Sequence, residues 1–194
     1  MKKTIICIII ALVALWGAFY TENLTEKNCR EQLSQLKPEE LVGVLMKDSL
    51  SHLDSRAITL KQLKEGYQDK TFAKQYGRVL GIGSPTFYII NDKCLRATIA
   101  DNELHGTAEN MLVTIPLKYI FGNTAREASG WFNIDNFQNT TDFNAISAAM
   151  NAFIAKKVKD FRANDNGEVE FLAGVAISSG SDLKRITLIP YDLK

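Results

Sequence analysis

The chain after Gly77 is a series of short β-type segments around one long helical segment, and this order constrains the fold most strongly. Five segments are rich in β-branched and aromatic residues: 79–90, 94–100, 111–120, 169–177 and 186–193. The segment 169–177 alternates apolar and polar residues, which is typical of a half-buried strand. Between the third and fourth segments, apolar residues from Phe143 to Phe161 recur at helical spacing and predict a helix beginning near Asn144, capped by Asp142 or Thr141.

This order predicts an α+β fold built on a five-stranded OB-like β-barrel with a helix between strands 3 and 4. Gly81, Gly83 and Pro85 interrupt the first strand, which has to bend sharply if it joins both sides of such a barrel. We expect a turn at Asn91-Asp92, between the first two strands.

A small helical cap is expected before the barrel. Pro38 suits a first helical position, and Thr59 and Asp69 suit the N-caps of two further short helices. The expected organisation is a leader (1–20), a linker (21–37) and one globular domain (38–194) made of a helical cap (38–76) and an OB-like barrel (77–194).

The first twenty residues have the pattern of an export signal or a membrane anchor. Lys2 and Lys3 precede an almost unbroken apolar run over residues 4–20. A cut after Ala18 would place Trp16 at the −3 position, where signal peptidase requires a small residue. We therefore interpret the segment as an uncleaved anchor, with a cleaved signal peptide and a buried core helix as the alternatives. In a Gram-negative source the body would lie on the periplasmic side of the inner membrane.

Two cysteines remain beyond the leader, Cys29 and Cys94. In an oxidising compartment they can form a disulfide, and two unpaired thiols are the alternative. Within the strand 94–100 the alternation puts Cys94 on the polar face, with Arg96 and Thr98.

Residue types that carry catalysis or hold metals are sparse. His52 and His105 are the only histidines, and neither has a second ligand at metal-binding spacing, so we expect no metal site and no cofactor. We place His105 in a turn over 102–106. Without the leader the chain has 21 basic and 22 acidic residues, which argues against nucleic acid as a partner.

Several short motifs in residues 38–194 occur together. They are Tyr76-Gly77, Gly83-Ser84-Pro85-Thr86-Phe87, Gly122-Asn123-Thr124-Ala125-Arg126, Phe132, Asp135-Asn136-Phe137-Gln138-Asn139 and Phe143-Asn144. As a set they resemble a bacterial family of predicted periplasmic lipoproteins of unknown function. The resemblance implies export and, because genes of members often lie near sugar ABC transporters, a setting in carbohydrate uptake. The family pattern has a lipidated cysteine after a short signal, which this sequence lacks, so an apolar helix would replace the acyl chain.

The stretch from Arg126 to Asn144 combines aromatic, amide and carboxylate side chains more densely than the rest of the chain. Aromatic faces with oriented polar groups are what a sugar or another small polar ligand needs. The candidate ligand-binding residues are Arg126, Trp131, Asp135, Asn136, Asn139 and Asn144. The alternative is an ordered loop whose aromatic rings fill the barrel and whose amides satisfy the loop backbone.

The sequence thus predicts an exported, membrane-tethered, non-enzymatic accessory or binding protein associated with a carbohydrate ABC-transport system. The alternative is a carbohydrate-binding or carbohydrate-processing module that uses residues 126–144. Hydrolysis would need paired acids, and Asp135 has no evident partner in the sequence. The expected partners are the membrane, through residues 4–20, and a transporter complex or a small polar ligand.

Overall fold

The computed structural model describes residues 37–137, 139–162 and 167–194. The predicted leader with its apolar run over 4–20, nearly all of the predicted linker, and Cys29 lie outside these residues. Among the helices of the described ranges, none is both long enough and apolar enough to cross a membrane.

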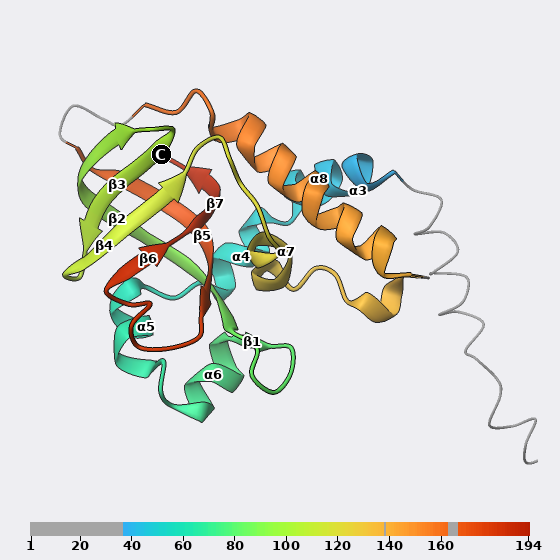
Figure 1. Cartoon of the computed structure of the whole chain (residues 1–194), viewed down its shortest axis with the longest axis horizontal. Coiled ribbons are helices and arrows are strands. Elements are labelled where there is room, and N and C mark those ends of the chain that lie inside the picture. The colour runs from blue at the N-terminus through green and yellow to red at the C-terminus, as the bar shows by residue number, and fades with distance from the viewer. Residues whose placement is uncertain (1–36, 138, 163–166) are drawn as a thin grey trace, which may run out of the picture.

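The described strands form one curled sheet (Figure 1). The strands are β1 (Arg78–Val79), β2 (Thr86–Ala100), β3 (Glu103–Ala108), β4 (Met111–Pro116), β5 (Val169–Ile177), β6 (Arg185–Thr187) and β7 (Ile189–Leu193). Their order is β6-β4-β3-β2-β5-β7, with β1 beside β2, and every pair is antiparallel except β4 with β6. Because Leu188 alone separates β6 from β7, the chain passes directly from one edge of the sheet to the other and brings the edges together.

The curled sheet with helices packed on it fits the predicted OB-like α+β class, but the predicted number of five strands is wrong, since the described residues form seven. The expected last strand, 186–193, is divided at Leu188 into β6 and β7. The backbone N–H of Leu188 donates to Thr114 O at 2.9 Å, so the crossing residue is itself bonded to β4.

The predicted turn at Asn91-Asp92 is wrong, because β2 runs through both residues without a break. Their side chains find partners on the neighbouring helices. Asp92 Oδ2 accepts from the backbone N–H of Leu60 at 2.8 Å, and Asn91 Nδ2 donates to Asp54 Oδ1. The polar groups that favour a turn in isolation are thus satisfied across the fold, and the strand continues.

The tight turns lie at Asp101-Asn102 and Glu109-Asn110, which join β2 to β3 and β3 to β4. Each pair has φ values of 51° and 64°, the left-handed conformation that two-residue hairpin turns require. The turn predicted around His105 is therefore wrong, since His105 lies within β3.

Cys94 is fully buried, and its predicted place on a polar face is wrong. The left-handed residue Arg96 (φ 56°) forms a bulge that shifts the register between Leu95 and Thr98. The bulge breaks the alternation on which the prediction rested. A Cβ atom at Gly106 would lie 2.9 Å from Cys94 Sγ, so the thiol fills the space left by that glycine.

We expect the Cys94 thiol to react with a disulfide reagent only after the protein unfolds. Burial raises its pKa to about 11, so the folded protein at pH 8 holds the unreactive protonated thiol. Mass spectrometry of reduced, then labelled protein should find the Cys94 peptide unmodified in buffer and modified in urea. Rapid labelling in buffer would contradict this expectation. The disulfide with Cys29 stays a prediction, and labelling of both cysteines in denatured, unreduced protein would exclude it.

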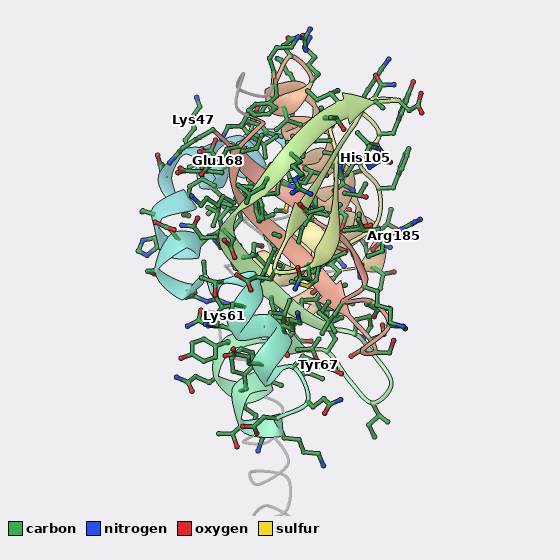
Figure 2. The ribbon with its side chains drawn as sticks, turned by 90° about the vertical axis from the view of Figure 1, so that its left-hand side faces the viewer. Lys47, Lys61, Tyr67, His105, Glu168 and Arg185 are labelled. Atoms are coloured by element: carbon green, nitrogen blue, oxygen red, sulfur yellow. The ribbon has the colours of Figure 1, made fainter. Side chains whose placement is uncertain are left out.

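Six α-helices and one 3₁₀ helix of the described residues cover the sheet. They are α3 (Pro38–Asp48), α4 (Leu50–Arg56), α5 (Leu60–Gly66), α6 (Lys70–Tyr76), α7 (Thr124–Ser129), α8 (Thr140–Val158) and the 3₁₀ helix η1 (Ile134–Asn136). Both predicted N-caps are confirmed: Thr59 forms a capping box with Gln62, and the Asp69 side chain accepts from Thr71 N. In Figure 2, Lys61 of α5 lies on the helical side of the molecule and Arg185 of β6 lies on the sheet side.

The connection between β4 and β5 holds two features that the sequence pattern did not predict. The short helix α7 packs against β2, β5 and β7 as well as α8, and its residues from Ala125 to Ser129 are all buried. Helix α8, which lies alongside α3 (Figure 1), begins at Thr140 because Asn139 is the N-cap. Asn139 Oδ1 accepts from the backbone N–H of Asp142 at 2.8 Å, so neither Asp142 nor Thr141 caps the helix.

Candidate functional site

Arg126 and Glu127 form an ion pair inside the protein, with exposed fractions of 4% and 1%. Arg126 Nε and Nη2 both donate to Glu127 Oε1, at 2.9 and 2.5 Å. Arg126 Nη1 donates to Phe143 O at 2.8 Å, and the guanidinium lies 3.5 Å from the centre of the Phe143 ring. Arg126, a predicted ligand residue, is therefore engaged by the protein itself.

Two further arginines hold the backbone at the end of α7 and just after it. Arg78 Nη2 donates to Phe132 O at 2.9 Å, and Arg78 Nη1 lies 3.7 Å from Glu127 Oε2. Arg56 Nη1 donates to Ser129 O at 3.2 Å. Guanidinium groups from α4 and β1 thus fix the segment that leads from α7 toward η1.

Four other predicted residues lie in three different elements or segments of the chain. Trp131 is half-buried, with its ring centre 6.3 Å from that of Tyr191. Asp135 and Asn136 are exposed on η1, and Asn139 is the N-cap of α8. The alternative interpretation of this stretch, in which an amide satisfies backbone groups, is correct for Asn139.

Asn144 lines a groove of about 670 Å³ between α8 and the segment 118–123, which we call the α8 groove. Its lining residues are Lys118, Tyr119, Ile120, Phe121, Gly122 and Asn123 from the segment, and Asn144, Ser147, Ala148, Asn151, Ala152 and Ala155 from α8. Those on α8 recur every three or four residues, so they share one face of the helix. The buried Arg126 supports this wall, because its Nη1 lies 3.5 Å from Asn144 Oδ1.

The α8 groove has aromatic rings on one wall and small and amide side chains on the other. Tyr119 is 60% exposed and Phe121 is 76% exposed, which is high for rings of this size. Asn151 Nδ2 donates to Gly122 O at 2.9 Å and ties the two walls together. Within the described part of the chain, the buried hydroxyl of Ser147 has no hydrogen-bond partner.

Tyr119 and Phe121 are not among the predicted site residues, and the strand predicted over 111–120 is too long. The strand ends at Pro116, and the next residues leave the sheet. The sequence signal for this was Pro116, which disfavours a continuing strand, followed by Tyr119 and Phe121 on either side of Ile120.

Acidic residues gather elsewhere, around a smaller pocket of about 210 Å³ lined in part by Asp54, Glu170 and Asp192. Lys157 Nζ lies 2.7 Å from Asp192 Oδ1, so this carboxylate is paired. In the three described ranges, no group of three histidine, cysteine or acidic side chains is arranged to hold a metal ion.

Comparison with known proteins supports the fold and gives the family. A solved structure of similar shape is an OB-fold protein from Thermotoga maritima, with a TM-score of 0.66 and 21% sequence identity over 82% of this chain and 98% of that one. No curated protein matches the chain. The family described as predicted periplasmic lipoprotein (DUF2291) matches residues 8–194, which confirms the resemblance and the location in the cell envelope. The chain therefore belongs to the DUF2291 family of predicted periplasmic lipoproteins.

Proposed function

We propose that this envelope protein is a non-enzymatic binding protein that holds a carbohydrate in the α8 groove and serves a carbohydrate transport system as an accessory. The observation that carries the proposal is the pair of exposed rings, Tyr119 and Phe121, beside the amide-bearing face of α8. A volume of about 670 Å³ is within the usual range for small-molecule sites.

The two walls of the groove match the two kinds of surface on a sugar ring. The C–H faces of a sugar are apolar and pack on aromatic rings, whereas its hydroxyls need both donors and acceptors. Amides such as Asn144 supply both, and the Ser147 hydroxyl is without a partner in the described residues. The alanines of α8 leave the room that a ligand would fill.

Binding is favoured over hydrolysis by the lining of the groove. Glycoside hydrolysis requires two carboxyl groups roughly 5–10 Å apart on either side of the scissile bond. The described lining residues include no aspartate and no glutamate. Asp135, the predicted acid, lies on η1 and is not among them.

Replacing Phe121 with alanine is expected to weaken sugar binding about tenfold or more, equivalent to about 1.4 kcal/mol, because a stacking surface is lost. Isothermal titration calorimetry of the full chain against a panel of mono- and disaccharides is the measurement, in a detergent without a sugar headgroup. Tyr76→Ala is the matched control, since Tyr76 is an exposed ring on α6 outside the groove and its loss should leave affinity unchanged.

Two outcomes would contradict the proposal. Equal loss of affinity in Phe121→Ala and Tyr76→Ala would remove the α8 groove as the site, and absence of binding to any sugar would remove the carbohydrate. The accessory role is tested separately by affinity purification of the full chain from its own membranes, which should retain subunits of a carbohydrate permease.

A further inference from the structure

The loop between β1 and β2 exposes an apolar tip. From Val79 to Gly83 the chain contains only aliphatic residues and glycine. Leu80 is 48% exposed and the Ile82 side chain is fully exposed. The loop extends beyond the sheet beside α6 (Figure 1). Aliphatic residues gathered at the tip of a loop are a common mark of an interaction site.

The tip is held in this exposed arrangement by its own hydrogen bonds. Ser84 Oγ accepts from the backbone N–H of Gly81 at 3.0 Å and donates to Gly81 O at 2.7 Å. Ser84 N also donates to Gly81 O, at 3.2 Å, and Gly83 takes the left-handed conformation that the turn needs (φ 79°). The loop therefore presents Ile82 outward rather than folding it back onto the body.

Cationic and aromatic side chains lie on α6, the helix that precedes the tip and packs against β1. Helix α6 ends at Tyr76, separated from β1 by one residue, and carries the exposed Lys70 and Lys74 one turn apart. Tyr76 is partly exposed. The nearby carboxylate of Asp69 is engaged as the N-cap of α6, where it accepts from the backbone N–H of Thr71. Apolar residues next to lysines and a tyrosine are typical of protein segments that enter a lipid interface.

The length of chain before α3 allows this face to reach a bilayer. The predicted linker 21–37 has 17 residues and can span at most roughly 60 Å. A folded body of this size has a radius of gyration of about 15 Å, so it is roughly 40 Å across. Tethering through residues 4–20 would keep the body at a high effective concentration near the lipid, so a weak insertion would suffice.

We propose that the β1–β2 loop inserts Leu80 and Ile82 into the leaflet of the membrane to which residues 4–20 tether the protein, with Lys70 and Lys74 at anionic headgroups. The occupant of the apolar tip is thus the lipid surface. The proposal rests on the predicted anchor but not on the α8 groove, so loop insertion and sugar binding can each fail alone.

Depth-dependent quenching in vesicles tests the insertion. The full chain, with Cys7 and Cys29 replaced by serine, is reconstituted into phosphatidylethanolamine–phosphatidylglycerol vesicles with an environment-sensitive fluorophore on Ile82→Cys. Brominated lipid is expected to quench this probe. A probe on Leu112→Cys, an apolar position of β4 that is 51% exposed, is the matched control and should keep its fluorescence.

A second variant checks the chemistry of the tip. Leu80→Asp in the Ile82→Cys background should abolish the quenching, because a charge in the tip opposes entry into hydrocarbon. Both substitutions are at exposed positions, so the circular dichroism spectrum should stay native. An Ile82 probe that brominated lipid quenches no more than the Leu112 probe would overturn the proposal, and so would quenching that Leu80→Asp leaves unchanged.

Discussion

Replacing Glu127 with glutamine is expected to lower the free energy of unfolding by about 3–5 kcal/mol, because it leaves the buried guanidinium of Arg126 without its counter-charge. Glutamine keeps the shape of the side chain, so the loss would reflect charge and hydrogen bonding rather than a cavity. Both Arg126 donors to Glu127 Oε1 lie within 3 Å of it, and Arg78 Nη1 also lies near the carboxylate. Urea unfolding of the detergent-solubilised full chain, followed by circular dichroism, measures the change.

Two companion variants separate charge burial from general sensitivity. Asp160→Asn removes an exposed carboxylate 3.9 Å from Lys159 and should change stability by no more than about 0.5 kcal/mol. Replacing Arg126 and Glu127 together with methionine should be less harmful than Glu127→Gln alone, because no uncompensated charge remains. If the free energy of unfolding of Glu127→Gln lies within about 1 kcal/mol of the wild-type value, the remaining partners of Arg126 are sufficient and the prediction is wrong.

Replacing Tyr191 with alanine is expected to cost about 3–5 kcal/mol, because it empties a fully buried aromatic site. Tyr191 Oη donates to Ala125 O at 2.6 Å, so β7 is bonded through this side chain to α7. A Cβ atom at Gly174 would lie 2.9 Å from Tyr191 Oη, which shows how closely the tyrosine side chain packs against β5. The exposed Tyr119→Ala is the matched control and should change stability by no more than about 0.5 kcal/mol.

Tyr191→Phe isolates the hydroxyl and should cost about 0.5–1.5 kcal/mol, because it removes the buried hydrogen bond to Ala125 O. Burial raises the pKa of Tyr191 well above its ordinary value of 10.0, against a smaller opposite effect of Arg56. Below pH 10 the folded and unfolded chains both keep this proton, whereas above pH 10 only the folded chain does. Stability should therefore fall as pH rises above 10, and less steeply in Tyr191→Phe. Identical unfolding curves for the variant and wild type would contradict the role given to this hydrogen bond.

Elements governed by neighbouring residues could be predicted from the sequence. Thr59 and Asp69 cap helices as expected, since a cap depends on residues two or three positions away. The alternation in 169–177 corresponds to β5, with the same bounds. Asn139 is also a residue type that favours an N-cap, although the predicted start of this helix, near Asn144, lies later in the chain.

Elements governed by distant partners could not be predicted. Asn91 and Asp92 favour a turn until Asp54 and Leu60 supply partners from other parts of the chain. Cys94 does not share a polar face with Arg96, because a bulge at Arg96 changes the alternation after Cys94, and no local pattern indicated that bulge.

The candidate site was predicted in part. Asn144 was identified from the density of amides and rings around it and does line the α8 groove. Arg126 is a predicted ligand residue on the same ground, yet it is paired with the residue next to it inside the protein. Tyr119 and Phe121 lie more than twenty positions before Asn144, so only the fold brings these rings beside it.

The sequence by itself determined the export pattern, the bounds of β5 and the presence of β-rich segments around one long helix, which indicated the OB-like class, because these follow from hydrophobic runs and local periodicity. The tertiary structure alone decided how the strands pair, which polar groups are buried, and which side chains form the α8 groove. The physical reason is that β pairing, ion-pair burial and groove formation depend on contacts between residues far apart in the chain. Leu188 illustrates the two levels. The local pattern predicts one strand over 186–193, and the fold divides this segment at Leu188 into β6 and β7, which lie at opposite edges of the sheet.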